Sequence, residues 1–460
     1  MPNFVVSIAR ARASFAAVSL LAVLLLPGVA QALEFRLDGY YRYRATYIGD
    51  MSLEQEPEAP ATTNWMEHRL LLRPHLRFSS GVHVQVEFDV MDLLRFGSAP
   101  EILPALGALQ ESGEAFDEPL PLSQSQIPGE DYRESLFVRR AWAELYTDYV
   151  DLKVGRMGDH WGMGLFINDG NGIQANDGDT VDRIMISTSR LQPVRLNLAF
   201  DTRAEGFINR NDDTHSFLLS GGYLGEVHQI GAYVRWTRQP SNSFNAVHAD
   251  LFAATQLGPL SLKLEAMLLW GQAQNTDIGV EDLDILAGGG AVDAKLSIDP
   301  FEVGLQFGIT SGDSNPTDNT WNTMRMDRSH DIALILFEHN IPQSPVGEFA
   351  DSENQNVDAS QALVGDSVSN AIYLNPTFMA SPVKNLRAGV SFVAAFPTVP
   401  TAFGPEAPDF YGAEIDGRFS YMFHGNFELA GEVGVFIPGP VFGEEKSPIF
   451  AAEARAQVHF

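Results

Sequence analysis

Oxygen-bearing side chains gather between glycines in the segment 168–182, "NDGNGIQANDGDTVD". Carboxylate and amide oxygens are the ligands that Ca²⁺ prefers, and the candidate ligands here are Asp169, Asn171, Asp177, Asp179 and Asp182. Their spacing is not that of an EF-hand loop, and Asn, Asp and Gly are also the commonest turn-forming residues. Two interpretations stay open, a calcium site and a polar turn, and no other cofactor is expected.

The residues at 154–172 read "VGRMGDHWGMGLFINDGNG" and contain many glycines. A phosphate-binding Gly-x-Gly-x-x-Gly loop that began at Gly162 would need a third glycine where the chain has Ile167. The chain also lacks a Walker loop, a His-Glu-x-x-His motif and a Gly-x-Ser-x-Gly elbow, and its eleven histidines are scattered. The sequence therefore predicts no catalytic residues and no enzymatic activity.

Arginines recur at alternating positions in two neighbouring segments, "LEFRLDGYYRYRATY" and "EHRLLLRPHLRF". If both segments are extended and paired, these side chains share one face, because successive side chains of a strand point to opposite faces. The resulting basic ladder would consist of Arg36, Arg42, Arg44, Arg69, Arg73 and Arg77, extended by Lys153. Such a ladder would attract anions or sugar acids. In the alternative interpretation, the interspersed carboxylates neutralise it.

The elements that would position these residues are long strands. In "FEVGLQFGIT", residues 301–310, apolar and polar or small side chains alternate strictly, and the same pattern recurs along the chain. Many of these segments reach the roughly 9–11 residues that a membrane-crossing strand needs, whereas strands of soluble domains usually have about 5–6. This pattern favours strands with one face toward lipid and one toward a lumen.

The connections between these segments alternate between short and long. Short turns near residues 79–81, 147–149, 190–193, 223–226, 257–259, 298–300, 381–384 and 424–426 separate longer connections. We therefore predict an all-β fold, a transmembrane antiparallel β-barrel of about 18 strands (range 16–20), with short periplasmic turns and long extracellular loops. The weakest predicted strand is Asp182 to Ser189.

Two apolar segments fall in the predicted long loops. Counting "DIALILFEH", residues 331–339, as a strand would make the strand number odd, so we assign it to an outer loop that folds inward; the alternative is an extra hairpin. The loop after Arg156 is also too apolar for water, so we expect it to pack on the barrel wall and narrow the pore. The predicted constriction residues are His160, Trp161, Met163, Phe166 and Asp169.

The termini and the charge indicate the compartment. Residues 1–32 have two arginines, an apolar run and a final Ala-Gln-Ala, which is typical of a secretory signal peptide and leaves 33–460 as a single barrel domain. The chain has no cysteine and a formal charge of −29, which argues against nucleic acid as a partner. The alternating last strand ends on Phe460, a pattern typical of recognition by the barrel-assembly machinery.

One longer segment carries a family resemblance. The sequence "VRRAWAELYTDYVDLKVGRMGDHWGMGLFINDGNG" resembles hairpins of large outer-membrane porin-like proteins. Together with "DIALILFEH" and the last strand, it is most similar to an uncharacterised barrel family of deltaproteobacteria such as myxobacteria, and more loosely to alginate-export channels. The resemblance implies a passive channel and carries over no substrate.

The expected function is a porin-type channel in the outer membrane of a Gram-negative bacterium, through which small polar or anionic solutes diffuse. Two alternatives stay open, an export channel for an acidic polysaccharide and a barrel whose long loops bind an external partner. The expected surroundings are outer-membrane lipid and lipopolysaccharide. The sequence does not determine the oligomeric state.

Overall fold

The computed structural model describes residues 34–49, 62–97, 136–176, 178–188, 190–204, 214–240, 243–274, 282–315, 318–339, 341, 367–400, 408–442 and 446–460. Predicted signal residues 1–32 therefore lie outside the described residues. No helix in the described part of the chain is long and apolar enough to span a membrane.

The described structure consists almost entirely of strands. The first group is β1 (Glu34–Ile48), β2 (Thr63–Arg77), β3 (Val82–Gly97), β4 (Leu136–Tyr146), β5 (Val150–Gly158), β6 (Thr180–Thr188), β7 (Val194–Ala204), β8 (Thr214–Leu224), β9 (His228–Gln239) and β10 (Phe244–Leu257). The second is β11 (Leu260–Gln274), β12 (Asp282–Ile298), β13 (Phe301–Thr310), β14 (Thr320–Trp321), β15 (Ala371–Val383), β16 (Leu386–Pro397), β17 (Gly412–Phe423), β18 (Phe427–Pro438) and β19 (Ile449–His459), with a short 3-10 helix η4 (Pro440–Phe442).

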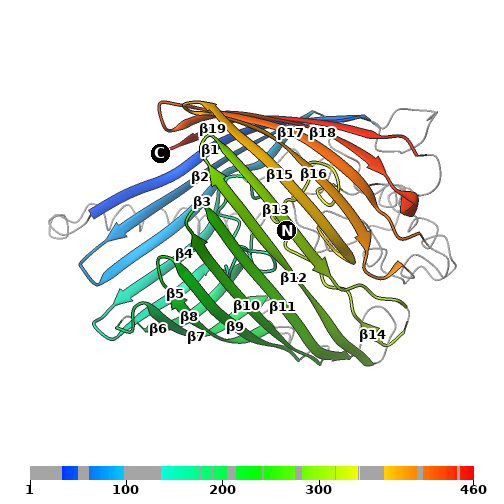
Figure 1. Cartoon of the computed structure of the whole chain (residues 1–460). Helices are drawn as coiled ribbons and strands as arrows, with labels where there is room; N and C mark the ends of the chain where they lie inside the picture. Colours follow the sequence, from blue (N-terminus) through cyan, green and yellow to red (C-terminus); the bar gives the residue numbers. More distant parts are fainter. Residues whose placement is uncertain are drawn as a thin grey trace, which may run out of the picture.

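These strands close into a barrel (Figure 1). Each strand pairs antiparallel with the next one along the chain, β13 pairs directly with β15, and β1 pairs with β19. The two-residue β14 stays outside this ring and pairs parallel with β12. The barrel therefore has 18 strands, which confirms the predicted fold class and strand number.

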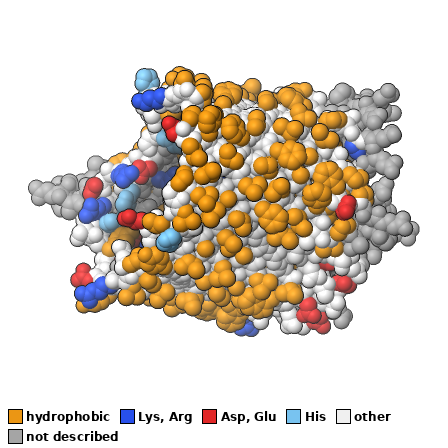
Figure 2. Space-filling model, in the orientation of Figure 1, with side chains coloured by type: hydrophobic (Ala, Val, Ile, Leu, Met, Phe, Trp, Pro, Cys, Tyr) orange, Lys and Arg blue, Asp and Glu red, His pale blue; other side chains and the backbone are white. Residues whose placement is uncertain are grey.

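The two faces of the wall differ as the alternation predicts. In β13, Phe301, Val303, Leu305 and Phe307 are exposed on the outside, between Glu302 and Gln306 on the inside. Figure 2 shows hydrophobic side chains over the outer face of the strands and charged side chains gathered at one end. An apolar outer face and a polar inner face are what a barrel in lipid requires.

All eight predicted short turns fall at connections between strands, although 223–226 and 381–384 begin within the last residues of β8 and β15, and the weakest predicted strand is present as β6. Residues 331–339 are not a strand; their apolar side chains are buried in a cluster with wall residues of β15, β16, β18, β19, β1 and β2. The prediction that residues 331–339 form an inward loop, made because an extra strand would give an odd number, is therefore confirmed.

The last residue takes part in closing the ring. The Gly39 amide donates to the Phe460 carbonyl oxygen at 3.0 Å, and the Phe460 amide donates to the Gly39 carbonyl oxygen at 3.2 Å. A Cβ atom at Gly39 would meet the Phe460 ring, so glycine lets the ring approach the β1 backbone. Phe460 thus adds one more hydrogen-bonded residue to the pairing of β1 with β19 that closes the barrel.

Candidate functional site

The loop between β5 and β6, residues 159–179, lies inside the barrel. At its start the Asp159 carboxylate, which is buried, accepts a hydrogen bond from the Tyr233 hydroxyl at 3.0 Å. The same carboxylate forms ion pairs with Arg183 of β6 at 3.0 Å and Arg235 of β9 at 3.3 Å. The loop therefore leaves β5 toward the lumen, because its first charge is held by inward side chains of two strands.

The apolar residues of this loop pack against inward side chains of the wall. Leu165 and Ile167 are both only 1% exposed, and the Trp161 ring lies 5.5 Å from the Tyr233 ring. Phe166 packs against the cluster that contains Met267 of β11. Burial of this kind explains how a loop with so many large apolar side chains exists within a polar lumen.

A wall carboxylate fixes the middle of the loop. The Met163 and Leu165 amides both donate to the Glu265 carboxylate of β11, the latter at 3.2 Å. Gly162 and Gly164 have φ values of 58° and 75°, in the left-handed region that favours glycine. The glycines therefore allow the backbone to curl so that neighbouring amides meet one carboxylate, and this is the role of the glycine-rich sequence.

Arginines of the wall hold the second half of the loop. Arg42 of β1, which is 1% exposed, donates to the Ile173 carbonyl at 2.7 Å, the Ala175 carbonyl at 3.3 Å and the Asn176 side-chain oxygen at 2.7 Å. Arg69 of β2 donates to the Ala175 carbonyl at 2.7 Å and pairs with a carboxylate of β3. These arginines satisfy backbone carbonyls that no strand partner satisfies.

Three more arginines contact the same loop. Arg44 pairs with Glu67 and donates to Asn176 at 2.8 Å. Arg140 of β4 pairs with Glu87 at 2.9 Å and donates to the Asp169 carbonyl at 2.6 Å. Arg455 of β19 donates to the Gln174 side chain at 2.7 Å.

Arg139 also faces the lumen, although it is adjacent to Arg140, and it donates to the Asp169 carbonyl at 2.9 Å. Glu87 pairs with Arg140 and Phe88 with Val138, so Arg139 is the unpaired residue of a β-bulge. A bulge re-aims one side chain, so both arginines of the "VRRAW" segment point inward, whereas strict alternation would place only one of them there. In the sequence, the only indication that both side chains contact the loop is the pair of adjacent arginines itself.

The predicted basic ladder is divided into two groups. Arg42, Arg44 and Arg69 hold the loop, whereas the rest lie nearer the short-turn end of the barrel. There Arg36 pairs with Asp38 at 3.0 Å, Arg77 with Glu34 at 3.1 Å and Lys153 with Glu144 at 2.6 Å. Arg73 is half-buried and forms no ion pair with any described residue. Within the described residues, the predicted ladder is therefore not a continuous row of cations without ion pairs.

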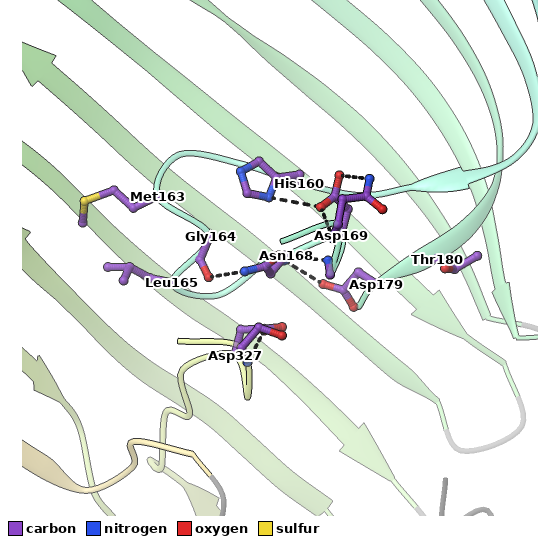
Figure 3. Close-up of polar contacts among 12 residues, drawn as sticks. His160, Met163, Gly164, Leu165, Asn168, Asp169, Asp179, Thr180 and Asp327 are labelled. Atoms are coloured by element: carbon purple, nitrogen blue, oxygen red, sulfur yellow. Dashed lines mark hydrogen bonds and ion pairs between the residues drawn. The ribbon is translucent and has the colours of Figure 1, made fainter. Parts of the chain in front are cut away.

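Figure 3 shows the polar residues where the inward loops meet. The His160 ring is 3.9 Å from the Asp169 carboxylate, and its side chain is 45% exposed. Asp169 accepts hydrogen bonds from the Asn171 amide at 3.0 Å and from the Asn171 side chain at 2.8 Å. Asp179 accepts from the Asn168 amide at 3.3 Å. These carboxylates stabilise the loop's own turns.

The described candidate calcium ligands do not all lie in the loop. Asp182 lies on the outer face of β6, where it forms a two-bond ion pair with Arg156 at 2.7 and 2.9 Å. It belongs to the strand rather than the loop, and its neighbours Val181 and Arg183 point inward. Asp177 lies outside the described residues. Among the residues that are described, no three His, Cys, Asp or Glu side chains form a metal-binding group.

A second inward loop follows β14 and packs against wall residues that include Tyr373 of β15 and Phe436 of β18. The amides of Leu334, Ile335 and Leu336 all donate to the Glu414 carboxylate of β17, each at 2.8 Å. The two loops touch, because the Asp327 amide donates to the Leu165 carbonyl at 2.6 Å. The two loops therefore lie against each other within the barrel.

One histidine of the second loop is held neutral. His330 shares a hydrogen bond of 2.9 Å with the Tyr373 hydroxyl. Burial lowers the pKa of His330 to about 4, because the charged ring would lose its hydration. At neutral pH this ring therefore adds no charge to the constriction.

Solved barrels resemble this architecture. OccK9 (OpdG) of Pseudomonas aeruginosa has a TM-score of 0.53 at 11% identity, over 92% of this chain and 98% of that chain. OccK11 (OpdR) and OccK3 (OpdO) of the same organism both have a TM-score of 0.51, at 11% and 13% identity, over 93% and 92% of this chain and 96% and 95% of those chains. No protein-family model and no curated protein sequence matches this chain. The chain thus shares the fold of outer-membrane porin structures.

Proposed function

We propose that this protein is a passive channel of the outer membrane, through which small polar or anionic solutes diffuse without an energy source and without a catalytic step. The observation that carries the proposal is the charge on the part of the wall that holds residues 169–176, formed by β1–β4 and β19. Six guanidinium groups meet four carboxylates there: Arg42, Arg44, Arg69, Arg139, Arg140 and Arg455 against Glu67, Glu87, Asp89 and Glu453.

The excess of positive charge on this wall favours anions, because rings of Arg and Lys select for anions in pores. The loop itself adds the carboxylates of Asp169 and Asp179, two residues whose backbone carbonyls accept hydrogen bonds from Arg140. Opposite charges at short range weaken each other's field. We therefore expect a modest anion preference rather than a strict one. Residues 159–179 would set the narrowest part of the path.

Planar-bilayer recording of the refolded protein under a salt gradient tests this function. The expected result is stepwise conductance with a reversal potential on the anion side. Absence of conductance steps would overturn the channel, and a reversal potential on the cation side would overturn the role of the arginines. Swelling of liposomes in neutral sugars and in sugar acids would then rank the solutes.

The setting of the channel follows from the same proposal. The short turns would face the periplasm, and the long connections would face the lipopolysaccharide surface. The barrel-assembly machinery would recognise the last strand, which ends on Phe460. The relationship to a myxobacterial-type barrel family, and more loosely to alginate-export channels, rests on the sequence segments alone. Export of an acidic polysaccharide and loop-mediated binding of a partner remain alternatives that the same recordings would address.

A further inference from the structure

Two histidines face each other on neighbouring strands near the short-turn end of the lumen. His75 of β2 and His83 of β3 both belong to the inward face of the wall. The Nε2 atom of His75 is 3.3 Å from the Nδ1 atom of His83, and the ring centroids are 5.0 Å apart. Neither histidine takes part in the contacts of the two inward loops described above.

This separation is the one that two ligands of a single metal ion adopt. Imidazole nitrogens bind Zn²⁺ at about 2.0–2.1 Å, and a tetrahedral angle between two such bonds places the nitrogens about 3.3–3.4 Å apart. The two nitrogens therefore already have the spacing of a chelating pair. To bind an ion, the shared proton would have to leave and the rings would have to turn so that both nitrogen lone pairs point at the ion.

Aromatic and charged residues surround the two rings. The Tyr146 ring lies 5.0 Å from the His83 ring, and the strand register places Gln85 opposite His75 and Glu144 opposite His83. The flanking cations Arg77 and Arg36 are paired with Glu34 and Asp38, and the Lys153 ammonium is held by Glu144. Arg73, two residues before His75 on the same face of β2, forms no ion pair with any described residue, so its charge is the repulsion that a bound cation has to overcome.

We propose that His75 and His83 form a binding site for one divalent transition-metal ion with an affinity for imidazole, namely Cu²⁺, Ni²⁺ or Zn²⁺. Within the described residues no third His, Cys, Asp or Glu completes the group, so water fills the other positions. Hard cations such as Mg²⁺ and Ca²⁺ prefer oxygen ligands and do not compete. If the proposed channel function holds, the bound ion adds positive charge to the lumen wall at this end.

Calorimetric titration of the detergent-solubilised full chain with Ni²⁺ tests the site without relying on conductance. The expected result is one saturable site per chain that excess Mg²⁺ does not displace. His75→Gln and His83→Gln each weaken it at least about tenfold, because even loss of a partner outside the ligand set commonly weakens a metal site about 10- to 100-fold. Bound Cu²⁺ should show nitrogen coupling in its electron paramagnetic resonance spectrum, and this coupling should be reduced in both variants.

The matched control is His459→Gln, because His459 is also near the short-turn end and its ring contacts Tyr40 at 6.4 Å instead of another histidine. This variant should bind Ni²⁺ like the unaltered chain. Absence of a saturable site would overturn the proposal. Unchanged binding in the His75→Gln/His83→Gln double variant, or equal weakening by His459→Gln, would also overturn it. A metal site in a barrel without conductance would reject only the channel function.

Discussion

Replacing Arg42 by lysine separates two roles that an arginine on the lumen wall can have. A free member of a basic ladder acts through its charge, which lysine retains. A loop anchor acts through the geometry of its guanidinium group, which lysine lacks. Because Arg42 donates three hydrogen bonds to the loop from two nitrogens, we expect Arg42→Lys to loosen residues 173–176.

The magnitude follows from the number of lost contacts. Lysine has one compact ammonium group instead of a planar fork of donors. It can therefore retain about one of the three hydrogen bonds that Arg42 donates to the loop. The other two are bonds from a charged donor, worth about 1.5 kcal/mol each at the low end of the usual range. The free energy of local opening should therefore fall by about 3 kcal/mol, which raises the open population somewhat more than 100-fold.

Hydrogen exchange measures this opening even when the open state is rare. The Ala175 amide donates to the Gly172 carbonyl at 3.1 Å, so its exchange rate reports whether this turn is closed. It should rise about 100-fold in Arg42→Lys and stay unchanged in Arg36→Lys. Arg36 lies on the same face of β1, but it is exposed and pairs with Asp38. Equal exchange rates in Arg42→Lys and the unaltered chain would refute the anchoring role.

The remaining predictions concern the pore itself. Deleting residues 162–178 should enlarge the single-channel conductance, and an unchanged conductance would show that this loop does not constrict the pore. Arg73→Glu should shift the reversal potential toward cations, because it reverses a charge that no described ion pair neutralises; an unshifted potential would remove Arg73 from the selectivity path. Since the pKa of His330 is lowered to about 4, the unfolded segment binds the proton first. Hydrogen-exchange protection of residues 331–339 should therefore fall as the pH drops from about 6.5 to about 4, and His330→Gln should remove this dependence.

The strands and turns were predictable from the sequence because lipid and lumen impose a strict period of two. The same period, combined with an even strand number, also placed residues 331–339 inside the barrel. Asp182 was both the first residue of its predicted strand and a candidate ligand. The structure begins β6 two residues earlier, at Thr180, so Asp182 lies within the strand, alternates with Val181 and Arg183, and points outward.

Contacts between residues far apart in the sequence could not be predicted in this way. Alternation places Arg42 and Arg69 on the inner face, but it does not reveal that a loop more than 100 residues away supplies their acceptors. The bulge that turns Arg139 inward is equally invisible, because it arises from the register between β3 and β4. The faces of strands follow from local sequence, whereas the partners of inward charges depend on how the loops fold back.

Both inward loops are held by hydrogen bonds between their backbone and charged side chains of the wall. Irregular backbone inside a barrel has amides and carbonyls without strand partners, and leaving them unsatisfied costs about 1–3 kcal/mol each. Glu265 and Glu414 accept hydrogen bonds from neighbouring amides of the loops, while Arg42 and Arg140 donate to carbonyls. Much of the charge on the inner wall thus also stabilises loop backbone. The formal charge of −29 is therefore a poor guide to selectivity, which depends on the charges of the inner wall, both those that hold the loops and those, such as Arg73, that do not.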